Sequence, residues 1–213
     1  MAKKKKLIII GAGGHARSVI ENAPENTFLG YVAPEPAAIA FGLPYEGDDG
    51  YIIANFNPDE FGIHLAIGFN DGCRLSLRRS IIERYKDFEA VTMISPSAIV
   101  TPNSVIEGGC AIMSRAVVNR SVLGQHCVVN TGAVIEHDCH IGTNVFIGPG
   151  AIICGEVTLG DDVFIGAGAV IRNGISVCAS ASVGMGAVVT HDITEPGIYV
   201  GSPARIKETK HNG

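Results

Sequence analysis

The amino-acid sequence predicts a mixed fold, in which a small α/β domain with a parallel sheet precedes a long parallel β-helix. An aliphatic residue recurs every six positions in the second half of the chain, and a short apolar run near the N-terminus leads directly into a glycine-rich turn. The 213 residues include 27 glycines and no tryptophan, which favours repeated tight turns over a helical bundle. We expect the α/β domain in residues 1–93, the β-helix in 94–194 and a C-terminal segment in 195–213.

Composition and charge exclude several classes of function. The net charge of −5 provides no electrostatic footprint for nucleic acid, and the lysine run at residues 3–6 is interpreted as a solvated tail. The apolar run at residues 7–10 is too short for a signal-peptide core or a membrane span, so we expect a cytoplasmic protein with no membrane partner. The six cysteines contain no Cys-x-x-Cys pair and are expected to be buried thiols.

The first predicted element is a buried strand, "LIII" at residues 7–10, followed at once by "GAGGHARSVIE". Gly11, Gly13 and Ala16 match the G-x-G-x-x-G/A pattern of a strand, a tight turn and a helix. Such glycines let the backbone approach a phosphate, and the positive N-terminus of the following helix favours that anion.

Further strands are expected at residues 28–32 and 63–68, a helix near 70–85, and a short strand at 91–94 that joins the β-helix. About ninety residues supply only one mononucleotide-binding half of a Rossmann-type fold, which excludes a dehydrogenase. The loops after the first and third strands would face one crevice. We therefore expect a nucleotide-linked ligand at Gly13, Gly14, His15 and Gly68. The alternative for His15 is a polar residue at a helix N-terminus with no ligand.

The six-residue repeat predicts the β-helix. Neither a 3.6-residue nor a two-residue period fits it, whereas three short strands with corners make one triangular coil. Residues 94, 100, 106, 112 and 118 keep the same spacing, and the shorter step from Val118 to Leu123 predicts one shortened corner. The fifth position of each unit is small or aliphatic and should also point inward. The lead positions are Leu123, Val129, Ile135, Ile141, Ile147, Ile153, Leu159, Ile165, Ile171, Val177, Val183 and Val189.

A dense polar cluster lies in this repeat, at "NTGAVIEHDCHIG" (130–142). His137 and His140 would point to opposite faces of an extended chain, and no third histidine is near, so we expect no metal site. Cys139 occupies an inward fifth position, which argues against a nucleophile. His137 should point outward near a corner, and His140 is interpreted as structural.

The repeats and the closing "GIYVGSPAR" (197–205) resemble the left-handed β-helix acyltransferases. With the α/β domain in front, the chain resembles the sugar-nucleotide acetyltransferases that modify amino-dideoxy sugars and sialic acids, with the bacillosamine-pathway N-acetyltransferase as the nearest pattern. The resemblance implies the left-handed coil, a homotrimer and acetyl-CoA as cosubstrate. It is carried by "GAGGH" (11–15), "AIGFN" (66–70), "SPSAIV" (95–100), "NTGAVIEHD" (130–138) and "GSPAR" (201–205).

The same resemblance implies roles for individual residues. His137 matches the general base of the family, Asp138 the acidic residue that raises its basicity, and Asn130 a residue near the site. Acetyl-CoA would lie between adjacent β-helices, where Phe146, Ala167 and Met185 match positions that touch it. Two further sites carry two interpretations each. Gly155 and Gly166 either allow close approach of the cofactor or are ordinary corner glycines, and Arg205 either meets the cofactor phosphates or is a surface charge.

The chemistry of acetyl transfer agrees with these roles. Attack of an amine on a thioester needs a base for the amine proton and donors for the oxyanion, which backbone N–H groups of an adjacent coil could supply. Histidine titrates near neutrality, and a carboxylate on its other ring nitrogen fixes the tautomer.

The sequence therefore predicts an acetyl-CoA-dependent N-acetyltransferase of a nucleotide-linked 4-amino-4,6-dideoxy sugar, with a UDP-linked sugar as the first expectation. The alternatives are a sialic acid O-acetyltransferase and a non-catalytic trimer that binds a sugar nucleotide. Where relatives often carry acidic residues after the second strand, this chain has Ala33 and Pro34, with Glu35 one step on. That departure leaves the nucleobase and the sugar open.

Overall fold

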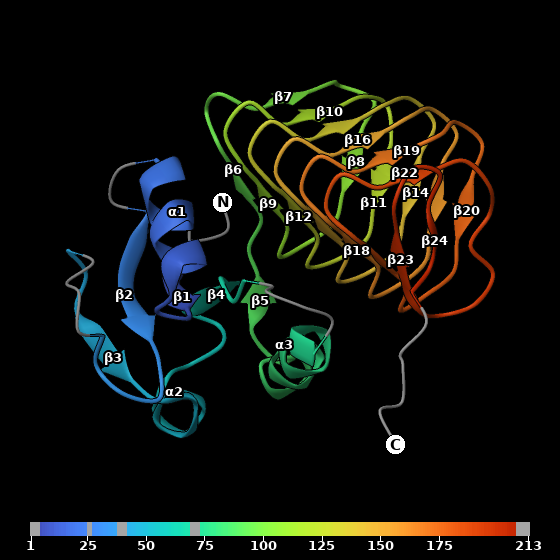
Figure 1. The fold of residues 1–213 in the computed structure, drawn as a ribbon. Helices are drawn as coiled ribbons and strands as arrows, with labels where there is room; N and C mark the ends of the chain where they lie inside the picture. The colour runs from blue at the N-terminus through green and yellow to red at the C-terminus, as the bar shows by residue number, and fades with distance from the viewer. Residues whose placement is uncertain (1–4, 25–26, 38–41, 69–72, 208–213) are drawn as a thin grey trace, which may run out of the picture.

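The computed structural model describes residues 5–24, 27–37, 42–68 and 73–207, which form an α/β domain docked on a triangular prism (Figure 1). None of the helices in these ranges has the length and hydropathy needed to cross a bilayer. The predicted fold class is confirmed.

The α/β domain is a five-stranded parallel sheet in the order β3-β2-β1-β4-β5. Helix α1 covers one face of the sheet, and α2 and α3 cover the other. The strand order reverses between β1 and β4, and the crevice at such a reversal is where α/β sheets bind ligands. The elements are β1 (Lys6–Ile10), α1 (Gly14–Asn22), β2 (Phe28–Val32), β3 (Tyr45–Gly47), α2 (Asp49–Asn55), β4 (Phe61–Leu65), α3 (Cys73–Arg84) and β5 (Glu89–Ala90).

The predicted elements of this domain are present with shifted ends. Strand β4 ends at Leu65, three residues before the predicted end, although the Ala66 N–H still donates to Ile10 O at 2.8 Å. The start predicted for the third helix, near residue 70, lies outside the described residues. The single strand predicted at 91–94 is wrong in part, because the chain changes sheets there. Strand β5 completes the α/β sheet, and β6 (Met93–Ile94) opens the prism.

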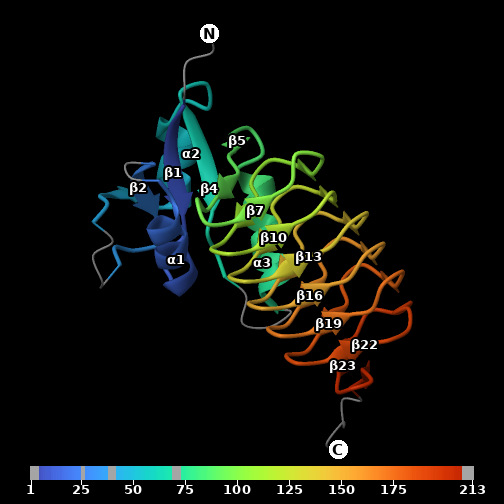
Figure 2. The ribbon, with the colours of Figure 1, turned by 90° about the horizontal axis from the view of Figure 1, so that it is seen from above.

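The prism has three faces, each a ladder of short strands, and its coils stack from the α/β domain to the C-terminus (Figure 2). This is the predicted left-handed parallel β-helix. The docking face holds β6, β9 (Ala111–Ile112), β12 (Val128–Val129), β15 (Phe146–Ile147), β18 (Phe164–Ile165), β21 (Ser182–Val183), β23 (Ile198–Val200) and the antiparallel β24 (Arg205–Ile206).

The other two faces follow the same pattern. The aliphatic face holds β7 (Ile99–Val100), β10 (Val117–Val118), β13 (Val134–Ile135), β16 (Ile152–Ile153), β19 (Val170–Ile171) and β22 (Val188–Val189). The polar face holds β8 (Val105–Ile106), β11 (Val122–Leu123), β14 (His140–Ile141), β17 (Thr158–Leu159) and β20 (Ser176–Val177). We call the corner between the docking and aliphatic faces the first edge, and the corner between the aliphatic and polar faces the second edge.

The prism core is built from the lead and fifth positions of the repeat, as predicted: all twelve lead residues from Leu123 to Val189 are buried. At the open N-terminal end the rule weakens, and Ile94 remains 42% exposed because no coil covers it. Cys110, Cys127 and Cys139 are buried thiols, whereas Cys154 and Cys178 are only partly covered. Part of the expected C-terminal segment extends the docking face, since β23 pairs with β21 and thereby covers the edge of the last coil.

The α/β domain packs on the docking face through an apolar layer. Outward side chains of that face, Ala111, Val128 and Phe146, join α1 and the sheet in one core cluster. The buried Arg78 of α3 fastens the contact, because its guanidinium donates to Ile67 O at 2.9 Å, to His126 O at 2.8 Å and to Asn144 Oδ1 at 2.9 Å. Burial lowers the pKa of Arg78 to about 10, so the group remains charged at neutral pH.

Candidate active site

A cavity of about 900 Å³ opens where β1 and β4 end, between the α/β domain and the docking face; we call it the interdomain cavity. It is lined by all four residues predicted to bind the substrate, Gly13, Gly14, His15 and Gly68. Asn130 and Phe146 line it from the prism side. The structure therefore brings residues from both parts of the chain to one concave site.

His15 lies against the floor of this cavity as a neutral ring. Its desolvation, with smaller effects from Arg78 and His64, lowers the pKa of His15 to about 4. The ring meets Phe146 edge-on with centroids 6.4 Å apart, and its buried Nε2 atom has no hydrogen-bond partner among the described residues. A Cβ atom at Gly68 would lie 2.9 Å from that of His15, so only glycine fits beside it. His15 thus lines the cavity that the sequence assigned to a ligand, and its unpaired ring nitrogen is buried.

The rim of the cavity carries charges that the sequence did not reveal. Asp49 at the start of α2 forms an ion pair with Arg84 of α3 and accepts a hydrogen bond from the Tyr85 hydroxyl at 2.8 Å. Burial, with the Asp49 contact, raises the pKa of Tyr85. Ala33 and Pro34 line the cavity at the position where acidic residues were expected in relatives. The rim was missed because α2 and β3 are too short and polar to give a periodic signal, although Asp48 caps α2 by accepting from Tyr51 N at 2.8 Å.

The catalytic pair predicted from the sequence lies on the second edge of the prism. His137 Nδ1 donates to Asp138 Oδ2 at 2.9 Å, with the tautomer assigned from that contact, and both side chains are about half exposed. Asp138 has φ 60°, a left-handed conformation that aspartate tolerates better than most residues and that folds its carboxylate back toward the preceding imidazole. Because Nδ1 faces the carboxylate, Nε2 faces away from it and can accept a proton.

Gly155 lies one coil below His137 and forms the floor under its ring. A Cβ atom at Gly155 would lie 2.7 Å from His137 Cε1 and 2.8 Å from Nε2. Gly155 does not have a positive φ, so the turn itself does not require glycine. The imidazole is what requires it. The structure therefore gives Gly155 a third interpretation, as the surface on which His137 rests.

Replacing Gly155 with alanine is expected to lower kcat roughly 10- to 100-fold, because the new methyl group pushes the imidazole away from its aligned position. Steady-state kinetics, with circular dichroism as a fold check, measure the effect. Gly174→Asn is the matched control: it lies on the same edge, has φ 70° that asparagine accepts, and nothing lies within 4 Å of its Cβ position. Equal losses in both variants would contradict the proposed contact.

The predicted cofactor residues have different surroundings. Phe146 is almost fully buried, stacks on Phe164 at 5.5 Å and lines the interdomain cavity, so it faces the substrate site rather than an open groove. Gly166 is explained by coil stacking, because a Cβ atom there would lie 2.5 Å from Met185 N. Ala167 and the strongly exposed Met185 lie on the first edge. Arg205 is exposed in β24 and donates to Ala204 O at 2.8 Å.

The candidate residues separate onto two edges of one prism. Asn130, Gly166, Ala167 and Met185 lie on the first edge, and the last three of these are cofactor candidates. His137, Asp138 and Gly155 lie on the second edge, across the whole width of the aliphatic face. A single chain therefore does not bring His137 to its own interdomain cavity. A site that uses both sets needs the second edge of one chain beside the first edge of another.

Separate family profiles match the N-terminal part and the repeat part of the chain. The profile of the PglD N-terminal domain matches residues 6–85. The profile of the bacterial transferase hexapeptide (six repeats) matches residues 120–155, and that of the hexapeptide repeat of succinyl-transferase matches residues 156–191.

Solved structures resemble the whole chain. The acetyltransferase domain of PglB from Neisseria gonorrhoeae is 32% identical with a TM-score of 0.87, over 96% of this chain and 100% of that one, and it has also been solved with acetyl coenzyme A. A mutant of perosamine N-acetyltransferase from Caulobacter crescentus, in complex with CoA and GDP-perosamine, is 32% identical with a TM-score of 0.87, over 96% of this chain and 97% of that one. WeeI from Acinetobacter baumannii shares the fold at 23% identity and a TM-score of 0.79.

Proposed function

The chain belongs to the family of hexapeptide-repeat acetyltransferases with a PglD-type N-terminal domain, and on this premise we propose that it acetylates the amino group of a nucleotide-linked sugar. It is an acyltransferase whose cosubstrate is acetyl-CoA. The proposed acceptor is a UDP-linked 4-amino-4,6-dideoxy sugar. The observation that carries the proposal is the exposed His137–Asp138 pair, held at 2.9 Å over the Gly155 backbone.

His137 is the general base of the proposed mechanism. Its Nε2 accepts the proton of the acceptor amine as the nitrogen bonds to the thioester carbonyl carbon. The resulting imidazolium, held by Asp138, gives that proton to the leaving sulfur when the carbon–sulfur bond breaks. Asp138 keeps the ring in the required tautomer and does not itself take the proton.

The interdomain cavity is the proposed site for the sugar nucleotide. Its diphosphate would lie at Gly13 and Gly14, where α1 begins and directs backbone N–H groups and its positive dipole end toward the cavity. A volume of about 900 Å³ accommodates a ligand of that size. The Caulobacter crescentus relative was solved with GDP-perosamine, which makes a GDP-linked sugar the first alternative to UDP.

An aliphatic ladder on the prism supports a homotrimer. The outward residue of every strand on the aliphatic face is Ile or Val, and Ile99 and Ile152 are 59% and 40% exposed. A continuous exposed apolar face marks a protein interface. Packing this face on a second copy would place the second edge of one chain near the first edge of the next, which is what the divided site requires. The ladder consists of Ile99, Val117, Val134, Ile152, Val170 and Val188.

A thiol-release assay against UDP-, dTDP- and GDP-linked amino sugars tests the function. We expect acceptor-dependent release of the CoA thiol with a UDP-linked 4-amino-4,6-dideoxy sugar, and a product whose mass spectrum shows one acetyl group on nitrogen. Release with a sialic acid instead would support the O-acetyltransferase. Tight binding of a sugar nucleotide without thiol release would support a non-catalytic trimer.

A further inference from the structure

The carboxylate that holds His137 is shared with a second cation. The Arg120 guanidinium donates through Nη2 to Asp138 Oδ2 at 2.7 Å, and His137 Nδ1 donates to the same oxygen at 2.9 Å. Arg120 was not among the residues selected from the sequence. Its side chain is 58% exposed, so it is not buried as part of the prism core.

The shortened corner of the β-helix accounts for the position of Arg120. The chain takes three residues, 119–121, to pass from β10 to β11, but four residues, 136–139, to pass from β13 to β14 one coil later. Asn119 pairs with Glu136, through Nδ2 and Oε2 at 3.2 Å, and Asp138 N–H donates to Arg120 O at 3.0 Å. Asn119 thus lies opposite Glu136 and Arg120 opposite Asp138, so the three-residue corner has no residue opposite His137. The gap leaves room for the Arg120 side chain to reach Asp138.

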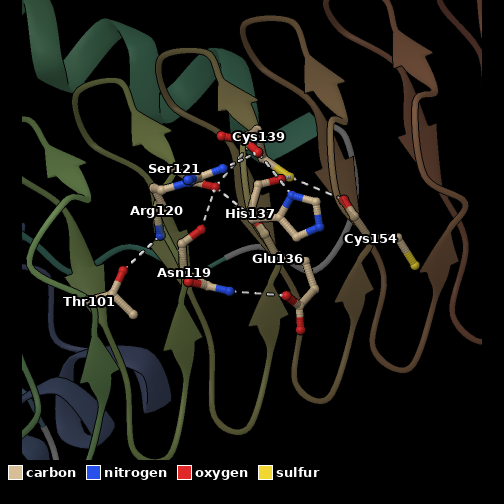
Figure 3. Close-up of polar contacts among 9 residues, drawn as sticks. Thr101, Asn119, Arg120, Ser121, Glu136, His137, Cys139 and Cys154 are labelled. Atoms are coloured by element: carbon tan, nitrogen blue, oxygen red, sulfur yellow. Dashed lines mark hydrogen bonds and ion pairs between the residues drawn. The ribbon is translucent and has the colours of Figure 1, made fainter.

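The corner that carries Arg120 is fixed by hydrogen bonds. Arg120 N–H donates to Thr101 Oγ1 at 2.8 Å, and the neighbouring Ser121 hydroxyl donates to Glu136 O at 2.7 Å and accepts from Cys139 N–H at 3.0 Å (Figure 3). The backbone of Arg120 is thus held by the coils before and after it.

The other ionisable groups around His137 have separate roles in the corner. The Glu136 carboxylate accepts from Asn119. Glu156 on the next coil is exposed, and its backbone N–H donates to His137 O at 2.9 Å. The Cys139 thiol donates to Cys154 O at 3.1 Å, and burial raises its pKa, so it stays neutral. Among the described residues, no lysine or arginine other than Arg120 forms an ion pair with the carboxylate of Asp138.

We propose that Arg120 is a positioning residue that acts through the carboxylate of Asp138 to keep the His137 imidazole unprotonated, so that the base works at lower pH than an isolated His–Asp pair. The proposal rests on the proposed function of His137. Protonating the ring would place a second cation on an oxygen that already pairs with a guanidinium. The hydrogen bond from Arg120, followed by that from His137, also holds the pKa of Asp138 below its usual value. The Arg120 and Asp138 side chains are about half exposed, so solvent screens their interaction and we expect only a modest shift of the pH profile.

Replacing Arg120 with glutamine is the direct test, and Arg120→Lys is the matched control that keeps the charge. Without the cation, the full carboxylate charge acts on the imidazole and favours its protonated form. The acid limb of the kcat/KM profile should then move to higher pH by on the order of 0.5 unit. At pH values below the limb, this shift lowers kcat/KM about threefold. The plateau above pH 8 should change by less than about twofold. Arg120→Lys should restore most of the wild-type profile, and 0.5 M salt should reduce the difference.

A proton NMR titration of the His137 ring provides a readout that needs no substrate. The resonance is assigned by its absence in His137→Gln, and its midpoint should rise by the same amount in Arg120→Gln and not in Arg120→Lys. An unchanged midpoint in both variants would overturn the proposal. A raised KM for either substrate with an unmoved acid limb would also overturn it and make Arg120 a binding residue. A shifted midpoint in a protein that releases no thiol with any amino sugar would uphold Arg120 and reject the proposed function instead.

Discussion

Replacing His137 with alanine is expected to lower kcat/KM for acetyl transfer by roughly 10²- to 10⁴-fold, the usual contribution of a general base. The imidazole is about half exposed on a corner and carries no part of the prism core, so the fold should survive its loss. Nδ1 is held by Asp138, and the ring rests over Gly155. The variant removes the proton acceptor and leaves both proposed binding regions unchanged.

His140→Ala is the control for this substitution. His140 lies three residues further on, points outward from β14 on the polar face and is exposed. We expect its kcat/KM to stay within about twofold of wild type, since surface changes away from a site have small effects. Analytical ultracentrifugation should find the same oligomer in both variants. Full activity in His137→Ala would remove the residue from the mechanism.

Mixing two inactive variants is expected to restore activity, because the candidate residues lie on different edges. The first variant is His137→Ala. The second is Gly13→Leu, which should abolish substrate binding without disturbing the fold: Gly13 has an extended backbone, nothing lies within 4 Å of its Cβ position, and it lines the interdomain cavity. Each homotrimer alone should be inactive.

If the proposed trimer is refolded from an equal mixture, each interface should combine a cavity from one chain with His137 from its neighbour. A quarter of the interfaces then pair an intact cavity with an intact His137, so about a quarter of wild-type activity should return. Mixing each variant with itself controls for refolding losses. Failure of the mixture to regain activity, with mixed trimers confirmed by mass spectrometry, would mean that the cavity and the base act within one chain.

The prism was predictable from the sequence because every six-residue unit contributes an aliphatic residue to its core. Inward positions tolerate only aliphatic or small residues, so the twelve lead positions from Leu123 to Val189 revealed the coil, although the docking face continues into β23, beyond residue 194. The α/β domain has no such repetition. Strand β3 and helix α2 span three and seven residues, too few for a periodic pattern, and the Asp49–Arg84 pair on the cavity rim was missed with them.

The site was predicted as a set of residues, and its arrangement required the structure. The spacing of the repeat already assigns each residue to a corner, which separates Asn130 from His137 by one face. The separation of these two residues shows that the site is divided only once the structure places the cavity beside the first edge. Arg120 could have been found from the sequence, because it precedes Asp138 by one coil in the hydrogen-bonded stack. Gly155 also lies one coil from its partner, His137.

The most direct test of the account is the position of His137 in a crystal structure of the oligomer with CoA and an amino-sugar nucleotide. The account predicts that Nε2 of one chain lies within about 3.2 Å of the sugar amine held in the cavity of its neighbour, or reaches it through one water molecule. An amine bound beyond the reach of every His137 in the assembly, or an imidazole covered by the subunit interface, would contradict it.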